Sequence, residues 1–311
     1  MSFCIGRFAP TPSGRMHLGN VFSALMAWAS VRSQNGSLIL RIEDLDIRAR
    51  NPQYTSYLLD DLQWLGLTWD KGPFYQSKRT ELYQEVLFKL KQQELLYPCF
   101  CSRADLHAAQ APHASDGAYV YAGTCRDLSK SEREELSKHK IPATRIRVPN
   151  KTYAFEDKVY GQTSQNLAKS CGDFIVQRAD EVFAYQLAVV VDDADMGVTE
   201  VVRGSDLLSS TPRQLYLQDV LGLSHPIYAH LPLLVAPDGR RLSKRNHDLD
   251  LGVLRAQGKT PEEILGFLAY CIGLAEKEEP LSAAQVANRF SWDVLRAHRK
   301  NVVVEHFSHV L

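Results

Sequence analysis

The first hundred residues alternate apolar strand patterns with helical ones, and this order constrains the fold more than any other feature. Residues 3–9 predict a short buried strand, and a loop with prolines and glycines separates it from a helical pattern at residues 18–32. A second strand is expected at residues 38–42, with helices at residues 53–65 and 80–96. Strands that alternate with helices predict a parallel sheet with crossover helices, so we expect an α/β protein.

Between residues 98 and 128 this pattern fails, because cysteines, glycines and small polar residues replace the apolar periodicity. Such a segment is typical of an insertion held together by something other than a hydrophobic core, and a bound metal ion is one candidate. The regular pattern then returns. We expect β-like runs at residues 144–159, strands of the main sheet at 183–191 and 199–203, a helix at 211–221, a last strand at 230–235, and helices after residue 250.

The bulk composition is that of an ordinary soluble protein, with 311 residues, 45% of them hydrophobic and 23% charged. No stretch approaches the roughly 20 apolar residues that span a bilayer, and the N-terminus lacks the basic and apolar regions of a signal peptide. We therefore expect a cytoplasmic protein with no membrane partner.

The 36 basic and 36 acidic residues balance, so no overall field attracts nucleic acid, and any RNA contact must use local basic patches. A solvated charged surface is an equally good interpretation of each patch taken alone. The candidates are Arg145, Arg147 and Lys151, and near the C-terminus Arg296, Arg299 and Lys300.

Three of the six cysteines, Cys99, Cys101 and Cys125, cluster in the irregular segment. Six cysteines are too few for a disulfide framework in a chain of this length, and in a reducing compartment the cluster favours a metal site. Zinc chemistry alone proposes His107 or His113 as the fourth ligand, because imidazole is a common zinc ligand. The alternative is three buried thiols without metal, which is how we interpret the remaining cysteines. Those are Cys4, Cys171 and Cys271.

The loop RFAPTPSGRMHLGN, residues 7–20, places Gly14 and Gly19 around His17 at a strand-to-helix junction. Glycines let the backbone approach a ligand, the helix N-terminus favours anions, and His17 can donate to a phosphate oxygen as charge develops. The loop is therefore a candidate phosphate site. An equally good interpretation is that proline and glycine serve only to turn the chain.

A basic loop, RLSKR at residues 241–245, follows the last predicted strand more than two hundred residues downstream. Lys244 offers a compact positive charge that can follow phosphates from the ground state to the transition state. Taken alone, such a loop is usually solvated surface.

Together the two motifs resemble class I aminoacyl-tRNA synthetases, with residues 17–20 as the HIGH motif and residues 241–245 as the KMSKS motif. The sequence around these motifs is similar to that of glutamyl-tRNA synthetases in the segments RFAPTPSG, LRIEDLD and VVRGSDLLSSTPRQ. The resemblance covers roughly residues 3–250. It implies a Rossmann-like catalytic core with a zinc-containing insertion and a small C-terminal helical region. The implied boundaries are 1–96 for the first half of the core, 97–172 for the insertion, 173–240 for the second half, and 241–311 for the KMSKS loop and helical region.

The resemblance also implies roles for individual residues. Glu43 would hold the substrate ammonium, and His17 and Lys244 would be catalytic. The glutamate pocket would comprise Arg7, Ala9, Thr11, Glu43, Tyr185 and Arg203, and ATP would bind His17, Gly19, Asn20, Arg241, Ser243 and Lys244. A dicarboxylate amino acid needs guanidinium groups for its acids and a carboxylate for its amine, which agrees with this set.

Two of these residues have ordinary structural interpretations, and the second motif departs from its consensus. Glu43 would cap a helix, and Arg203 would form a surface ion pair with Asp206. Arg241 replaces the first lysine of KMSKS and Arg245 its last serine, which preserves positive charge but puts the closing motion of the loop in question.

Only some sixty residues follow the second motif, whereas glutamyl-tRNA synthetases continue into a large anticodon-binding region. This short form resembles the glutamyl-queuosine tRNA(Asp) synthetases, which implies ATP with Mg²⁺, L-glutamate and queuosine-containing tRNA(Asp) as reactants. We expect a monomer. The same resemblance implies a structural zinc ion held by Cys99, Cys101, Tyr121 and Cys125. The alternatives are a truncated glutamyl-tRNA synthetase that charges an acceptor end, and a catalytically silent RNA-binding module.

Overall fold

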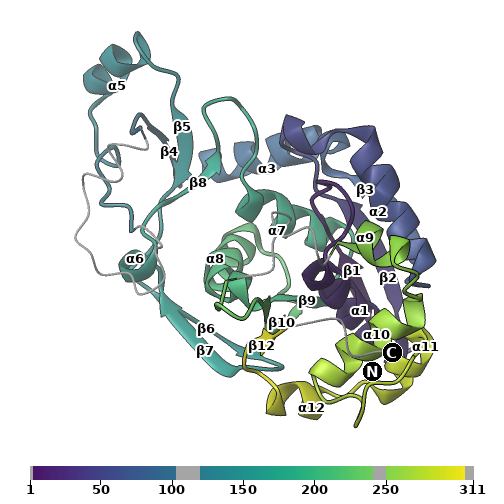
Figure 1. Ribbon diagram of the computed structural model, residues 1–311. Helices are drawn as coiled ribbons and strands as arrows, with labels where there is room; N and C mark the ends of the chain where they lie inside the picture. Colours follow the sequence, from purple (N-terminus) through teal and green to yellow (C-terminus); the bar gives the residue numbers. More distant parts are fainter. Residues whose placement is uncertain (1–2, 103–119, 241–249, 305–311) are drawn as a thin grey trace.

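The computed structural model describes residues 3–102, 120–240 and 250–304. Within these ranges a seven-stranded sheet has the order β3-β2-β1-β9-β10-β6-β7, in which all neighbours are parallel except β6 and β7 (Figure 1). The predicted α/β fold with a parallel sheet is confirmed. Its strands are β1 (Ile5–Phe8), β2 (Ser37–Ile42), β3 (Lys71–Tyr75), β6 (Thr152–Asp157), β7 (Gly161–Asn166), β9 (Glu200–Gly204) and β10 (Ile227–Leu231).

Helices cover both faces of this sheet, and the alternation of β2 shows how the two cores are divided. Leu38, Leu40 and Ile42 point into one core, whereas Ile39 points into the other. The first core is covered by α1 (Leu18–Ser33), α2 (Pro52–Trp64), α9 (Leu251–Ala256), α10 (Pro261–Cys271) and α11 (Ala283–Arg289). The second is covered by α3 (Thr80–Gln92), α7 (Tyr185–Asp195) and α8 (Thr211–Leu221).

Helix α1 is buried along most of its length because it lies between the sheet and α11. Leu18, Val21, Leu25 and Met26 are fully buried, so the helix lacks a polar face. His17 caps its N-terminus by accepting a hydrogen bond from the Gly19 backbone N–H at 3.1 Å. The first predicted motif is therefore fixed at the start of the most buried crossover helix.

The prediction of a strand at residues 183–191 is wrong, because helix α7 occupies Tyr185–Asp195. Its valines favour strands, but an apolar run is also what a helix buried on several sides requires, and periodicity cannot separate the two. The helix predicted at residues 80–96 ends earlier, at Gln92, where Glu94 takes a positive φ of 58°. The chain then enters a strand.

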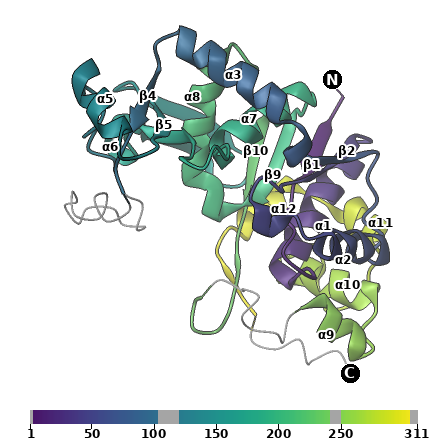
Figure 2. The same ribbon diagram turned by 90° about the horizontal axis from the view of Figure 1, so that it is seen from above.

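That strand, β4 (Leu96–Cys99), forms a separate antiparallel sheet with β5 (Ala143–Ile146) and β8 (Phe174–Gln177). Figures 1 and 2 show this sheet, with α5 (Lys130–Ser137), lying to one side of the main sheet. Hairpin β6–β7 joins the main sheet where Asp157 pairs with Tyr228 of β10. The remaining elements are α6 (Leu167–Ser170), α12 (Trp292–Ala297), the parallel pair β11 (Leu234–Val235) and β12 (Val302–Val303), and three 3₁₀ turns at Ile47–Ala49, Gln76–Lys78 and Ser205–Ser210.

None of the helices in the described ranges is both long enough and apolar enough to cross a membrane.

Candidate active site

A cavity of about 440 Å³ opens at the carboxyl ends of the central strands. The strand order reverses between β1 and β9, and ligands of open α/β sheets bind at such a switch point. The structure brings together every predicted pocket residue that lies in the described ranges. The cavity is lined by Arg7, Ala9, Thr11, His17, Gly19, Asn20, Glu43, Tyr185 and Arg203, among others.

The glycine-containing loop is held against α2 by two adjacent carboxylates. Asp61, fully buried, accepts hydrogen bonds from the Met16 backbone N–H at 2.9 Å and from Arg15 Nη1 at 2.5 Å. Asp60 pairs with Arg15 and with Arg255 of α9, each at 2.6 Å. These contacts with α2 fix the shape of the loop, and other residues of the loop line the cavity, where a ligand can bind.

Arg241, Ser243 and Lys244 lie outside the described residues, but the chain that follows them returns to the first motif. Asp250 forms an antiparallel bridge with His17, and the Leu251 backbone N–H donates to the Met16 carbonyl at 2.9 Å. The described chain therefore resumes beside the first motif, at the edge of the cavity.

Glu43 follows β2 and faces the cavity with a side chain that is 11% exposed. Burial raises its pKa to about 7, despite the opposing charges of Arg41 and Arg7. The 3₁₀ turn after it is capped by Asp46, whose carboxylate accepts from the Arg48 backbone N–H, so the capping role considered for Glu43 is wrong.

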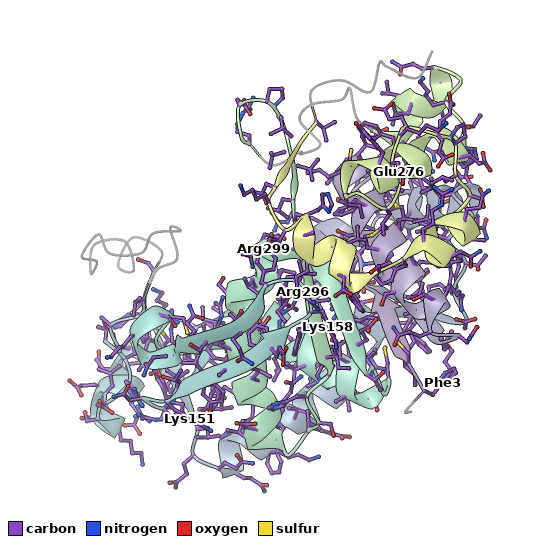
Figure 3. All side chains as sticks on the ribbon, turned by 90° about the horizontal axis from the view of Figure 1, so that it is seen from below. Phe3, Lys151, Lys158, Glu276, Arg296 and Arg299 are labelled. Atoms are coloured by element: carbon purple, nitrogen blue, oxygen red, sulfur yellow. The ribbon has the colours of Figure 1, made fainter. Side chains whose placement is uncertain are left out.

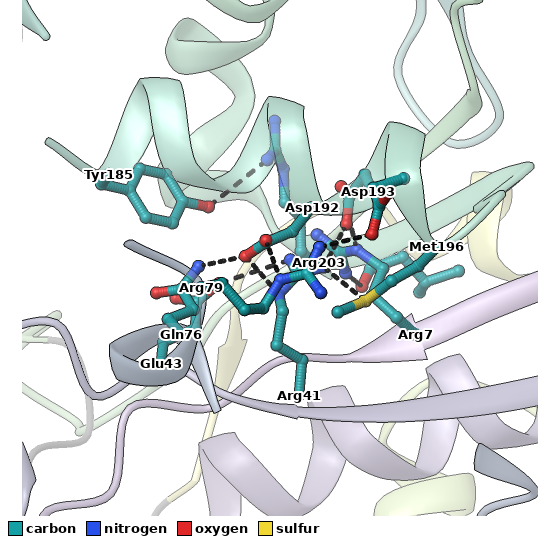
Figure 4. A network of polar contacts seen from close by, with 12 residues as sticks. Arg7, Arg41, Glu43, Gln76, Arg79, Tyr185, Asp192, Asp193, Met196 and Arg203 are labelled. Atoms are coloured by element: carbon teal, nitrogen blue, oxygen red, sulfur yellow. Dashed lines mark hydrogen bonds and ion pairs between the residues drawn. The ribbon is translucent and has the colours of Figure 1, made fainter. Parts of the chain in front are cut away.

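Beneath Glu43, a buried network of charges links the cavity to α7 (Figure 4). Arg41 is fully buried, with Nη1 2.6 Å from Asp193 Oδ1 and Nη2 3.5 Å from Glu43 Oε1. Asp193 also accepts from Arg7 Nε at 3.4 Å. Although burial alone would raise it, the pKa of Asp193 lies below its ordinary value because Arg41 and Arg7 outweigh burial. One carboxylate therefore orients two arginines.

The neighbouring Asp192 anchors the other side of the same network. It is fully buried and accepts from Gln76 Nε2 at 2.8 Å, from Arg79 Nε at 2.7 Å and from the Tyr83 hydroxyl at 2.9 Å. The sequence motifs did not indicate that Arg41, Asp192 and Asp193 belong to the site. Two adjacent acids inside the apolar run of α7 were the available signal, since buried carboxylates need partners.

Arg203 is buried at 6% exposure, so its interpretation as a surface residue is wrong. Its Nε donates to His230 Nε2 at 3.1 Å and its Nη2 to Thr211 Oγ1 at 2.8 Å. Tyr185, at the start of α7, lies with its hydroxyl 3.5 Å from Arg203 Nη1 (Figure 4). These contacts orient the guanidinium in the wall of the cavity.

The cysteine cluster lies at the end of β4 in the small sheet, and none of its members lines the cavity. The Sγ atoms of Cys99, Cys101 and Cys125 lie within 4.8 Å of one another, with 3.6 Å between Cys101 and Cys125. The Tyr121 hydroxyl lies 3.6 Å from Cys99 Sγ and 3.9 Å from Cys101 Sγ. A zinc–sulfur distance of about 2.3 Å gives tetrahedral edges of roughly 3.8 Å, so these four donors fit one metal ion. His107 and His113 lie outside the described residues.

Arg145 belongs to this cluster. It is 5% exposed, stacks on the Tyr121 ring at 3.8 Å, and donates from Nε to Cys99 Sγ at 3.1 Å. Burial alone would raise the pKa of Cys99, but the hydrogen bond from Arg145 helps to bring it below its ordinary value. Arg145 therefore does not belong to an exposed RNA-binding patch.

The C-terminal basic residues lie where α12 meets the β6–β7 turn (Figure 3). Arg296 Nε donates to the Lys158 carbonyl at 3.3 Å, and the Tyr160 hydroxyl donates to the Arg299 carbonyl at 2.9 Å. Arg299 and Lys300 are exposed. As candidates for contacting RNA they remain a prediction.

Comparison with known proteins identifies the class. The family described as "tRNA synthetases class I (E and Q), catalytic domain" matches residues 5–308. The fold is similar to that of a glutamate tRNA ligase from Elizabethkingia meningosepticum, crystallised with its amino acid, with a TM-score of 0.81 and 25% identity over 97% of this chain and 67% of that one. The chain belongs to the class I tRNA synthetases of the glutamate and glutamine group, which confirms the predicted Rossmann-like fold class.

Relatives in sequence identify the family within this class. A glutamyl-Q tRNA(Asp) synthetase from Symbiobacterium thermophilum is 47% identical over 310 residues, covering 96% of this chain and 94% of the relative. One from Nitratidesulfovibrio vulgaris is 45% identical over 280 residues, with 86% of each chain covered. Within the class, this chain belongs to the glutamyl-Q tRNA(Asp) synthetases, which are ligases of the aminoacyl-tRNA synthetase type.

Proposed function

We propose that this enzyme activates L-glutamate with ATP as glutamyl-adenylate and transfers the glutamyl group to the queuosine base in the anticodon of tRNA(Asp). The observation that carries the proposal is the cavity at the switch point of the sheet, where Glu43 and the buried Arg7 and Arg203 line the same space as the loop at residues 7–20. The names of the relatives supply the RNA substrate.

Glutamate recognition follows from the charges in the cavity. Glu43 pairs with the substrate ammonium, while Arg203 and Arg7 face its carboxylates and Tyr185 adds a hydroxyl. Ala9 and Thr11 supply the wall between them. A bound ammonium favours the ionised form of Glu43, so substrate binding compensates the burial of this carboxyl group.

ATP binds at the other end of the cavity, over Gly19 and Asn20 at the start of α1. The glutamate α-carboxylate attacks the α-phosphorus in line, a new C–O–P bond forms, and pyrophosphate leaves. His17 and Lys244 stabilise charge on the transferring and leaving phosphates, and Arg241 and Ser243 also take part in binding ATP. Mg²⁺ bound to the phosphates would neutralise the remaining charge. No side-chain nucleophile is required, since positioning and electrostatics lower the barrier.

In the second step a hydroxyl on the cyclopentene ring of queuosine attacks the adenylate carbonyl. An ester forms, AMP leaves with the electron pair of the C–O bond, and the hydroxyl proton passes to the phosphate or to solvent. The acceptor is thus a base in the anticodon loop instead of the terminal ribose.

Cys99, Cys101, Tyr121 and Cys125 hold Zn²⁺ in this proposal, as a structural ion. The spacing of the donors supports a four-coordinate site, and the Cys125 backbone N–H, which donates to the Tyr121 hydroxyl oxygen at 2.8 Å, supports a phenolate ligand. The ion would brace a segment whose described residues form a small cluster of buried side chains.

The test is transfer of labelled glutamate, with ATP, to purified tRNA(Asp) that carries queuosine and to the same tRNA with unmodified guanosine. Label on the queuosine form alone is the expected result. Equal label on both forms would indicate acceptor-end charging, and label on neither, together with no glutamate-dependent pyrophosphate exchange, would indicate a silent binding module. Both outcomes contradict the proposal.

A further inference from the structure

His230 on β10 links the cavity to a hairpin on its far side. It is fully buried between Arg203 of β9 and Asp157 at the end of β6. Its Nε2 accepts from Arg203 Nε at 3.1 Å, and its Nδ1 lies 2.6 Å from Asp157 Oδ2. Tyr228 stacks on one side of the ring and Phe155 packs nearby, with ring centroids 6.2 Å and 6.3 Å away. The imidazole therefore has one fixed position.

These contacts determine where the ring proton lies. A guanidinium nitrogen can only donate, so His230 Nε2 must be the acceptor and Nδ1 must carry the proton. The Nδ1–H group donates a hydrogen bond to the Asp157 carboxylate. Burial, together with the positive charge of Arg203, lowers the pKa of His230 and outweighs Asp157, which favours the neutral ring required here.

Asp157 is itself held rigidly by the hairpin turn. Its Oδ1 accepts from the backbone N–H groups of Val159 and Tyr160, both at 2.9 Å. Its Oδ2 accepts from the backbone N–H of His230 at 3.1 Å. The carboxylate is thus fixed by backbone groups before it meets the imidazole. A chain of hydrogen bonds runs from this turn through one tautomer of His230 to the arginine in the cavity wall.

We propose that His230 is a positioning residue for substrate specificity: through Nε2 it fixes the guanidinium of Arg203, and Asp157 fixes the tautomer that makes this possible. The proposal rests on the proposed function, since it takes Arg203 to bind a carboxylate of glutamate. Nε is tied to His230 and Nη2 to Thr211, so Nη1, which lies 3.5 Å from the Tyr185 hydroxyl, is the nitrogen that remains to meet an acidic side chain.

The decisive test compares two amides at position 230. His230→Gln keeps an acceptor near the Nε2 position, whereas His230→Asn keeps a polar group near Nδ1 and removes the acceptor. In glutamate-dependent pyrophosphate exchange, the Asn variant should raise the KM for glutamate about tenfold with kcat little changed, as expected for the loss of one hydrogen bond to a charged group. The Gln variant should keep a KM near that of the wild type.

Asp157→Asn tests the tautomer. The Asn amide donates where the carboxylate accepted, which drives the ring proton to Nε2, where it opposes Arg203 Nε–H. The KM for glutamate should rise in this variant, but much less when Asp157→Asn is combined with His230→Gln, because an amide side chain has no tautomer to lose. A purely structural role of the pair predicts equal effects in both backgrounds.

The exposed pair His225–Asp219, 2.9 Å apart, provides a matched control, and His225→Asn should leave the KM unchanged. Urea unfolding of each variant separates a loss of folding from a change in KM. Equal KM values for the Gln and Asn variants, or a loss confined to kcat, would overturn the role of His230. An inactive wild-type enzyme would instead contradict the proposed function.

Discussion

Replacing Glu43 by glutamine should stabilise the ligand-free protein at alkaline pH and at the same time abolish glutamate binding. In an unfolded chain this carboxyl group has its ordinary pKa of 4.5, whereas burial raises the pKa to about 7 in the folded protein. The folded state therefore holds an extra proton between these values, and the stability it provides is lost as the pH rises through 7. The loss is about 2.5 kcal/mol between pH 5 and pH 8. This is an upper value, because the side chain keeps 11% exposure to the cavity.

The assay is urea unfolding of the wild type and of Glu43→Gln at pH 5 and pH 8, without ligand. Glutamine lacks the titration, so the difference in unfolding free energy between the two proteins should shift by about 2.5 kcal/mol in favour of the variant at the higher pH. Added glutamate should raise the stability of the wild type at pH 8 and leave the variant unchanged. Glu156→Gln, at an exposed position on β6, serves as the control substitution outside the cavity.

A constant gap between the Glu43→Gln variant and the wild type at both pH values would refute the reasoning. It would mean that the folded protein stabilises the ionised form of the Glu43 carboxyl group as well as water does. Stabilisation of the variant by glutamate would remove Glu43 from the recognition of the ammonium group.

Three further predictions concern other parts of the molecule. Lys244→Ala should lower the rate of adenylate formation about 10²–10³-fold in single-turnover experiments. Asp193→Asn should destabilise the protein by about 3–5 kcal/mol in urea unfolding, because Arg7 and Arg41 lose the buried carboxylate they share. Cys125→Ser should lower the zinc content measured by plasma mass spectrometry and the melting temperature together, whereas Cys271→Ser should leave the zinc content unchanged.

Local sequence was sufficient where a pattern and its consequence lie close together. The strand–loop–helix opening, with Gly14 and His17 before a buried apolar helix, predicted β1, the loop and α1 to within a few residues. The spacing of Cys99, Cys101 and Cys125 likewise predicted a cluster that the fold brings together. For the opening, a few neighbouring residues carry the backbone geometry, and for the cluster the chemistry of the thiols is enough to predict that they meet.

The sequence could not decide structure that depends on burial by distant segments. The apolar run of α7 fits a strand or a buried helix equally well, and only packing against α3 and α8 selects the helix. Glu43 was predicted to face the substrate, but its raised pKa depends on desolvation by the assembled pocket.

The partners of the charged residues were decided by the tertiary structure alone. Arg41 meets Asp193 across 152 positions of the chain, and His230 meets Asp157 across 73. Sequence determined which residue types are present, and its motifs indicated that Arg7, Glu43 and Arg203 belong to one site. Which carboxylate orients each arginine follows from the packing of α7 on the sheet, and the tautomer of His230 follows from the order of β6, β10 and β9, because hydrogen bonds form only between groups that the fold brings within about 3 Å.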